Sequence, residues 1–300
     1  MIQPSKLTPG NTIGILCPAG AIPLEKVTIC AQVLESWGYQ VRIGKTVGTK
    51  FGHFAASDLD RQNELQSMMD DPEIHAILCA RGGYGLSRIV SQLDFTKIKA
   101  HPKWVIGFSD ITILHAALQK QGIQSIHGPM SAAFGKGDAG LPYILALKQM
   151  LEGAAAPVQA KAHPSNRLGY SEGVLVGGNL CLMTHLIGSK NQLDTKGKIL
   201  CIEDVGEYHY NVDRMLIQCK NAGLLDGLAG FVVGGFTEMK DEAAEFGETV
   251  TEMILRITKG ANYPICFDFP ISHELNNMPV QLGANYALTV TANAALLTKI

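Results

Sequence analysis

Short apolar runs alternate with segments of helical periodicity through the first half of the chain, and this alternation leaves few folds open. Strands are predicted at residues 12–17, 39–43 and 74–79, with helical spacing over residues 23–37 and 57–70 between them. Short apolar strands separated by helices are typical of a parallel sheet that is covered on both faces. We therefore predict an N-terminal parallel sheet flanked by helices, of the Rossmann-like or flavodoxin-like type.

The composition changes between residues 151 and 172, where Gly, Ala and Pro are frequent and no periodicity is sustained. Regular elements then return, with strands predicted at 174–176, 198–202, 230–236, 264–268, 280–291 and 294–298 and helices near 211–221 and 242–259. We expect residues 1–150 to form an N-terminal α/β domain, residues 151–172 a linker, and residues 173–300 a C-terminal α/β domain with a mixed β-sheet.

The overall composition fits a globular protein with no special affinity for polyanions. The chain has 300 residues, of which 46% are hydrophobic and 17% charged, and its formal net charge is -2. Such a balance offers no basic surface, so we expect neither nucleic acid nor membrane as a partner. The first residues lack a basic segment followed by an apolar one, and no apolar run is long enough to span a bilayer. We expect a cytoplasmic location.

The cysteines and histidines show no spacing that would build a metal site. The Cys count is 7, no Cys-x-x-Cys occurs, and Cys17, Cys79, Cys181, Cys201 and Cys266 lie in or beside apolar runs. Buried thiols in a reducing compartment fit this pattern best. We expect no metal and no cofactor. A Cys–His hydrolase is a weak alternative because nothing singles out one cysteine.

Ser109 lies where an apolar strand at residues 104–106 turns into a helix over residues 111–118. Such a corner can expose a nucleophilic serine beside the free amides of the helix. The match to the Gly-x-Ser-x-Gly elbow is partial, because Gly107 is present but Ile111 occupies the second glycine position. Serine is also a common N-cap, so the local sequence leaves both roles open.

Loops that follow parallel strands meet at the carboxyl edge of the sheet, where ligands bind. This rule places residues 18–20, residues 81–85 and Ser109 on one rim. If Ser109 is a nucleophile, the oxyanion hole would come from the amides of Asp110 and Gly83. Alternatively the glycine-rich loop cradles a phosphate, although neither a Gly-x-Gly-x-x-Gly nor a Walker sequence is complete.

A nucleophilic serine needs a base and a carboxylate that orients the base. Two later strand ends carry such groups: Glu203 follows the apolar run 200–202, and His273 lies just beyond residues 264–268. Acids and histidines at strand ends are often only solvated loop residues, so neither position is decisive alone.

Taken together, the motifs resemble the serine LD-carboxypeptidases, or murein tetrapeptide carboxypeptidases, with their microcin-immunity branch. The matching segments are Gly10-Asn-Thr-Ile-Gly-Ile15, Pro18-Ala-Gly20, Ala80-Arg-Gly-Gly-Tyr-Gly85, Ile106-Gly-Phe-Ser-Asp-Ile-Thr112, His127-Gly-Pro129, Gly177-Gly-Asn-Leu180, Ile202-Glu-Asp-Val-Gly-Glu207 and Phe269-Pro-Ile-Ser-His-Glu274. The resemblance covers nearly the whole chain. It implies a catalytic triad of Ser109, Glu203 and His273 in a cytoplasmic, often dimeric hydrolase.

The resemblance further implies that the enzyme releases the terminal D-alanine of a murein tetrapeptide during peptidoglycan recycling. It assigns substrate contacts to Asn179 and Glu238, and we add Arg81, Gly82 and Tyr84 of the glycine-rich loop. The alternatives are a microcin-C-type immunity peptidase or another amide hydrolase with the same triad. A non-catalytic nucleotide- or sugar-binding protein is the alternative from another class.

Overall fold

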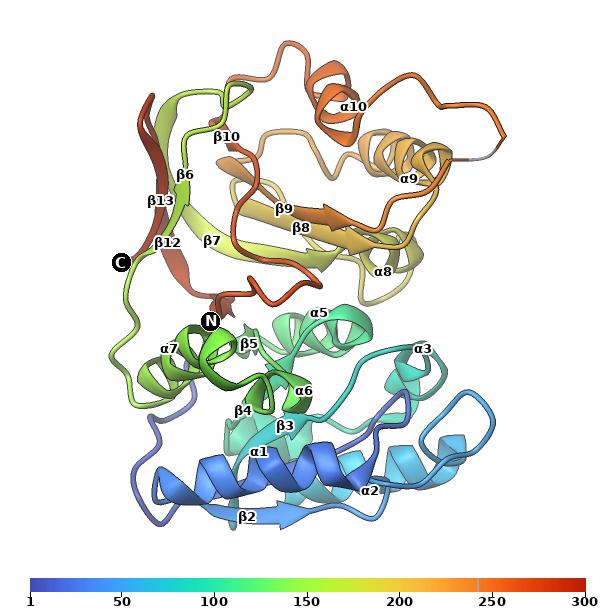
Figure 1. Cartoon of the computed structure of the whole chain (residues 1–300), viewed down its shortest axis with the longest axis vertical. Coiled ribbons are helices and arrows are strands. Elements are labelled where there is room, and N and C mark those ends of the chain that lie inside the picture. Colours follow the sequence, from blue (N-terminus) through green and yellow to red (C-terminus); the bar gives the residue numbers. More distant parts are fainter. Residues whose placement is uncertain (242) are drawn as a thin grey trace. The chain divides into compact units, whose positions relative to one another are not determined.

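The computed structural model describes residues 1–241 and 243–300, which divide into two compact units (Figure 1). Unit 1 comprises Met1–Ala155 and Met278–Gly283, and unit 2 comprises Ala156–Asn277 and Ala284–Ile300. Each unit contains its own β-sheet. No helix in the described part of the chain is both long and apolar enough to cross a membrane.

Unit 1 is built on a sheet in the order β11-β5-β4-β3-β1-β2. Its strands are β1 Thr12–Leu16, β2 Gln40–Ile43, β3 Ile74–Cys79, β4 Trp104–Gly107, β5 Ser125–His127 and β11 Val280–Leu282. The strands β1 to β5 pair in parallel, and β11 is antiparallel to β5. The predicted N-terminal parallel sheet is confirmed.

Helices cover both faces of this sheet, because successive strand residues point to opposite sides and the residues of β1 are buried on both. The helices are α1 Leu24–Ser36, α2 Asp58–Asp70, α3 Leu86–Ile89, α4 Thr96–Ala100, α5 Thr112–Lys120, α6 Ser131–Phe134 and α7 Leu141–Leu151, with short 3₁₀ helices η1 Val90–Gln92, η2 Ser109–Ile111 and η3 Gly137–Ala139. In β1, Ile13 and Ile15 share one core with apolar residues of α1 and α7. Gly14 faces the other side, where a Cβ would lie 2.8 Å from the sulfur of Met68 in α2.

Unit 2 contains a mixed sheet in the order β10-β9-β8-β7-β12-β13-β6, as predicted. Its strands are β6 Val158–Lys161, β7 Gly169–Asn179, β8 Ile199–Val205, β9 Gly230–Thr237, β10 Ile265–Cys266, β12 Asn285–Val290 and β13 Ala294–Lys299. The long strand β7 takes part in both halves, since Leu175–Asn179 pairs in parallel with β8 and Gly169–Val174 pairs antiparallel with β12. The helices are α8 Leu180–His185, α9 His209–Asn221 and α10 Val250–Ile257, and α9 contacts both of the others (Figure 1).

The observed boundaries differ from the expected ones at two places. The segment 151–172, expected as a linker, contains β6 and the first residues of β7. In β6 only Val158 and Ala160 are buried, so its alternation is too short to stand out in the sequence. Residues 278–283 belong to unit 1 because β11 pairs with β5, a partner far away in the sequence.

The helix expected over residues 242–259 is α10, which is shorter; its N-terminus is a capping box formed by Thr249 and Glu252. Glu242, where that helix was expected to begin, lies outside the described residues.

Candidate active site

Ser109 lies at the strand–helix corner that the sequence predicts. Strand β4 ends at Gly107, and Ser109 opens η2 with a φ of 64°. A non-glycine residue in this left-handed region costs on the order of 1–3 kcal/mol, and such residues cluster at functional sites. Neither η2 nor α5 has a side-chain N-cap hydrogen bond, so Ser109 does not act as the helix cap. The geometry therefore favours a half-buried nucleophile over a capping serine.

Close packing explains why glycine precedes this corner. A Cβ on Gly107 would lie 2.8 Å from Cγ1 of Ile111 and 3.2 Å from the Cβ of Cys79. The fully buried Ile111 thus fills the space beneath the turn at the position where the elbow motif has its second glycine. The bulky residue is compatible with the corner because it packs inward against Gly107.

His115 contacts the backbone of the corner through the carbonyl of Gly107. It was not predicted from the sequence as a site residue. It is fully buried in α5, with Nε2 2.9 Å from the carbonyl oxygen of Gly107. Burial lowers the pKa of His115 to about 4, against a smaller opposing effect of this hydrogen bond. The neutral imidazole therefore donates to Gly107. The only signal in the sequence is a histidine at an apolar position of a helix.

The glycine-rich loop after β3 lies directly against the nucleophile within unit 1. A Cβ on Gly82 would lie 2.8 Å from the Cβ and 3.1 Å from the Oγ of Ser109. The Gly20 amide donates to the carbonyl of Gly82 at 2.8 Å, and Arg81 Nη1 donates to the carbonyl of Ala21 at 2.6 Å. The three loops predicted on one rim therefore adjoin one another.

The remaining positions of this loop differ in exposure. Gly83 has a φ of 100°, and a Cβ there would lie 3.4 Å from the Cα of Gly20. Tyr84 is 45% exposed, and its ring centroid lies 5.9 Å from that of Phe54. Asp110 is fully buried, and its Oδ2 accepts a hydrogen bond from the Leu86 amide at 2.8 Å.

In unit 2, Glu203 and His273 form a directly bonded pair. Glu203 is fully buried near the end of β8, and its Oε2 lies 2.5 Å from Nδ1 of His273. The segment before His273 packs directly against Gly234 of β9, which has no side chain. A Cβ on Gly234 would lie 2.1 Å from the carbonyl oxygen of Ile271. The Gly235 amide donates to the same carbonyl at 2.9 Å.

Charge determines the ionisation of His273. Burial alone would lower the pKa of His273, but the hydrogen bond and charge of Glu203, together with the charges of Asp204 and Glu238, raise it above its ordinary value. Glu238 is exposed and is a second non-glycine residue with a left-handed backbone, at a φ of 53°. Because its charge raises the pKa of His273, Glu238 lies within electrostatic reach of the imidazole.

Asn179 is engaged inside unit 2. It is 3% exposed; its Oδ1 accepts from the Leu182 amide at 3.2 Å and caps α8, and its Nδ2 donates to Oδ1 of Asp204 at 2.8 Å. The other oxygen of Asp204 accepts from the Cys181 amide at 2.9 Å. Burial raises the pKa of Asp204 to about 6.

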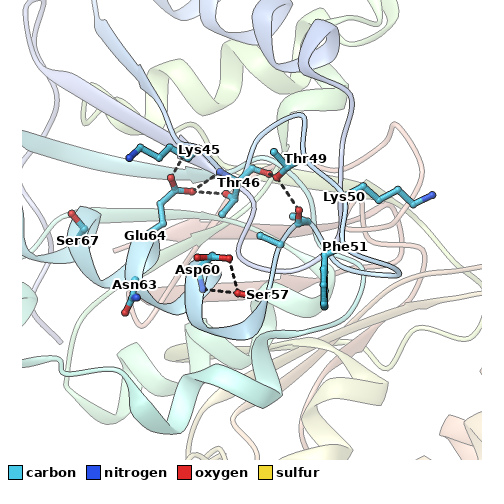
Figure 2. A pocket seen from close by; sticks show the side chains of 12 residues that line it. Lys45, Thr46, Thr49, Lys50, Phe51, Ser57, Asp60, Asn63, Glu64 and Ser67 are labelled. Atoms are coloured by element: carbon cyan, nitrogen blue, oxygen red, sulfur yellow. Dashed lines mark hydrogen bonds between the residues drawn. The ribbon is translucent and has the colours of Figure 1, made fainter.

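A separate pocket opens beside α2 in unit 1 and includes none of the predicted site residues (Figure 2). Its volume is about 630 Å³. Glu64 projects toward its wall, but its carboxylate already accepts from the amides of Lys45 and Thr46 and from the Thr46 hydroxyl. Asp60 is bonded to Ser57 in the N-cap of α2. Both acidic side chains that line the pocket are thus already hydrogen-bonded within unit 1.

Burial opposes formation of a thiolate nucleophile at the cysteines that it shields. All seven thiols are free, and burial raises the pKa of Cys17 and of Cys30 to about 12, so both are protonated at neutral pH. Among residues 1–241 and 243–300, no group of three His, Cys, Asp or Glu side chains could hold a metal ion.

Comparison with protein-family models identifies the same family that the sequence motifs resemble. Residues 13–128 match the LD-carboxypeptidase N-terminal domain, and residues 172–288 match the LD-carboxypeptidase C-terminal domain. The chain belongs to the LD-carboxypeptidase family. The two matched domains fall mainly in units 1 and 2, and the predicted family is confirmed.

Several relatives and solved structures resemble the chain over almost its whole length. A probable murein peptide carboxypeptidase of Bacillus subtilis is 35% identical, with 98% of this chain and 94% of the relative covered. The crystal structure of muramoyltetrapeptide carboxypeptidase from Oxalobacter formigenes matches with a TM-score of 0.86 and 28% identity, covering 96% of this chain and 98% of that one. The microcin C7 self-immunity protein MccF, bound to aspartyl sulfamoyl adenosine, shares the fold with a TM-score of 0.88 at 21% identity over 100% of this chain and 99% of that one.

Proposed function

We propose that this protein is a serine carboxypeptidase that hydrolyses the amide bond between an L-centre and the terminal D-alanine of murein tetrapeptides, in peptidoglycan recycling. Membership of the LD-carboxypeptidase family and the names of the relatives in Bacillus and Oxalobacter support the substrate class. The observation that carries the mechanism is Ser109 in a left-handed corner, packed against the glycine-rich loop.

In this mechanism Ser109 attacks the carbonyl carbon of the scissile amide. Nε2 of His273 takes the hydroxyl proton and passes it to the nitrogen of the leaving D-alanine. Glu203 holds the proton on Nδ1, so that Nε2 is the nitrogen that acts as the base. The amides of Gly83 and Asp110 stabilise the oxyanion of the tetrahedral intermediate. Water then hydrolyses the acyl-enzyme by the same proton route. The proposed nucleophile belongs to unit 1 and the proposed base to unit 2.

Substrate recognition is assigned to both units. Arg81, Gly82 and Tyr84 are proposed to contact the terminal carboxylate side of the peptide, since the Arg81 guanidinium has further N–H groups besides the one bonded to Ala21. Glu238 is proposed to face an amino group on the substrate, and Asn179 a neighbouring amide.

The same proposal covers location and assembly. We propose a cytoplasmic homodimer that binds neither nucleic acid nor membrane and uses no cofactor. Seven free thiols agree with a reducing compartment. Sedimentation velocity of the purified protein measures the assembly, and a single monomeric species at micromolar concentration would contradict the dimer.

The decisive experiment combines a peptide panel with variants of Ser109 and Glu203. Tri-, tetra- and pentapeptides of murein type, together with an aminoacyl sulfamoyl nucleoside, are incubated with the enzyme, and the released residue is identified. We expect D-alanine from the tetrapeptide, and a loss of about 10⁴- to 10⁶-fold in rate for Ser109→Ala. The double variant Ser109→Ala, Glu203→Gln should be no slower than the worse single variant, because triad members act as a unit.

Three results would overturn the proposal. Cleavage of the nucleoside but not of the tetrapeptide would favour the microcin-type reaction. Absence of covalent labelling of Ser109 by a fluorophosphonate, with tight binding of a nucleotide or sugar, would indicate a binding protein. Activity of more than a few per cent in Ser109→Ala would exclude the serine mechanism.

A further inference from the structure

We propose that Asp110 is a positioning residue: its buried side chain fastens the loop that carries Gly83 to the corner that carries Ser109, and so fixes the two oxyanion-hole amides relative to each other. The role assigned to Asp110 rests on the proposed function, because it presupposes that these amides stabilise an oxyanion. It adds a task for the Asp110 side chain, whereas the oxyanion hole uses only its backbone amide.

The contact that supports this role joins two adjacent strand ends of unit 1. Asp110 directly follows Ser109 after β4, and Leu86 begins α3 at the end of the loop that follows β3. Oδ2 of Asp110 accepts a hydrogen bond from the Leu86 amide at 2.8 Å, with the carboxylate fully buried. A buried bond from a backbone amide to a carboxylate is charge-assisted and strongly directional. It therefore restrains the loop much more than an exposed contact would.

A buried arginine backs the same loop from the α2 side. Arg61 is fully buried; its Nη1 donates to the carbonyl of Pro18 at 2.6 Å, and its Nε donates to the carbonyl of Ala56 at 3.2 Å. A Cβ on Gly85 would lie 2.6 Å from Nη1 of Arg61, so the guanidinium packs directly against the loop. Burial raises the pKa of Asp110 to about 6, while the Leu86 hydrogen bond and the charge of Arg61 oppose this rise.

Unit 2 repeats the arrangement around its own predicted catalytic residue. Asp204 directly follows Glu203, is buried, and accepts from the Cys181 amide in the first turn of α8, the helix that follows the adjacent strand β7. In both units, therefore, a carboxylate directly follows a proposed triad residue and accepts an amide from the neighbouring strand–helix junction. Asp110 follows Ser109, and Asp204 follows Glu203. The two sheets differ in topology, so the common feature is associated with the site rather than with one fold.

The test compares Asp110→Asn with Asp94→Asn. Asp94 is the matched control, because its carboxylate also accepts a backbone amide at a helix start, from Thr96 at 2.8 Å, but at an exposed position outside the proposed site. Active sites are counted by end-point titration with a fluorophosphonate, so that rates refer only to folded enzyme. Asp110→Ser is made in parallel in case the asparagine variant folds poorly.

We expect kcat per titrated site of Asp110→Asn to fall about 10- to 100-fold with little change in KM, because a misplaced amide weakens transition-state binding more than substrate binding. The inhibition constant of a peptide boronate, whose boron replaces the scissile carbonyl carbon, should rise by the same factor. Asp94→Asn should match the wild type in all three quantities.

Unchanged kcat and unchanged boronate affinity in the Asp110 variants would overturn the positioning role, as would an effect confined to KM. These results are distinguishable from failure of the proposed function. In that case the wild-type enzyme itself would neither be titrated at Ser109 nor bind the boronate.

Discussion

Nδ1 of His273 lies 2.5 Å from Oε2 of Glu203, and the carboxylate is fully buried whereas the imidazole keeps 16% of its side-chain surface exposed. The buried partner fixes the ring orientation and the tautomer with the proton on Nδ1. With the proton held on Nδ1, Nε2 is the nitrogen that can accept a proton. The proposed role of His273 as general base therefore makes the activity depend on pH in a defined way.

The first prediction concerns this pH dependence. Since Glu203 raises the pKa of His273 above 6.5, kcat/KM should rise with pH through an apparent pKa above that value, because only the neutral imidazole accepts a proton. Glu203→Gln should lower the pKa of His273 and reduce the rate by about 10⁴-fold. The pH profile and an NMR titration of the imidazole measure both effects.

The same pair also affects stability. The histidine pKa is raised in the folded state, so the stabilisation is fully present below pH 6.5 and is lost as the pH rises through the raised pKa. Asp241→Asn is the matched control, because Asp241 forms a second carboxylate–histidine contact in unit 2, 2.7 Å from Nδ1 of His209. It should leave the titration of His273 unchanged. An unaltered His273 pKa in Glu203→Gln would contradict the assigned cause.

The second prediction uses the contact between Gly82 and Ser109. In Gly82→Ala the added methyl group would meet the Cβ of Ser109 at 2.8 Å and the carbonyl oxygen of Phe108 at 3.1 Å. The nucleophile or the loop must shift, and a displacement of this kind costs about 100-fold in kcat/KM. Gly135→Ala is the control, since its nearest neighbour would be an Ile29 carbon at 3.7 Å. Comparable activity of the two variants would show that the site tolerates the shift.

The third prediction concerns His115 and the acid stability of unit 1. Its pKa is lowered to about 4 in the folded protein, so the unfolded chain binds a proton first as the pH falls. Stability should therefore fall between about pH 6.5 and pH 4, by about 1.4 kcal/mol per pH unit at most. In His115→Gln, which can still donate to Gly107, this part of the slope should be absent in urea titrations compared with the wild type. Parallel curves for the two proteins would rule out His115 as its source.

The sequence was sufficient to predict those parts of the structure that local residue patterns determine. The alternation of strands and helices gave the parallel sheet of unit 1, because apolar strands such as β1 are buried on both faces. Ser109 could be located from its strand–helix junction, but its left-handed backbone could not, since the surrounding packing imposes it.

Strand pairing between segments that are distant in the sequence could not be predicted from the sequence. No local pattern near Val280–Leu282 indicates that β11 pairs with β5. The alternation of β6 is too short to predict a strand by itself, and β6 is recognised as one only from its pairing with β13. The hydrogen bonds of Asp110 and Asp204 were missed for the same reason. Each looks like an ordinary loop acid beside a motif residue, and only burial next to a specific amide reveals its contact.

The last prediction concerns Glu238 and the peptide it is proposed to grip. A murein tetrapeptide can carry an amino group on the L-residue before the scissile bond, and Glu238 is an exposed carboxylate within electrostatic reach of His273. A charge-assisted hydrogen bond contributes about 1.5–3 kcal/mol, so Glu238→Gln should lower kcat/KM roughly 10- to 150-fold on a peptide with L-lysine at that position. The loss should shrink on the same peptide with L-norleucine, because the partner charge is then absent in both enzymes. Glu245→Gln, at another exposed acid of unit 2, should affect neither peptide. Equal losses of Glu238→Gln on the two peptides would show that Glu238 acts through its strained backbone or through the pKa of His273, not through the substrate amine.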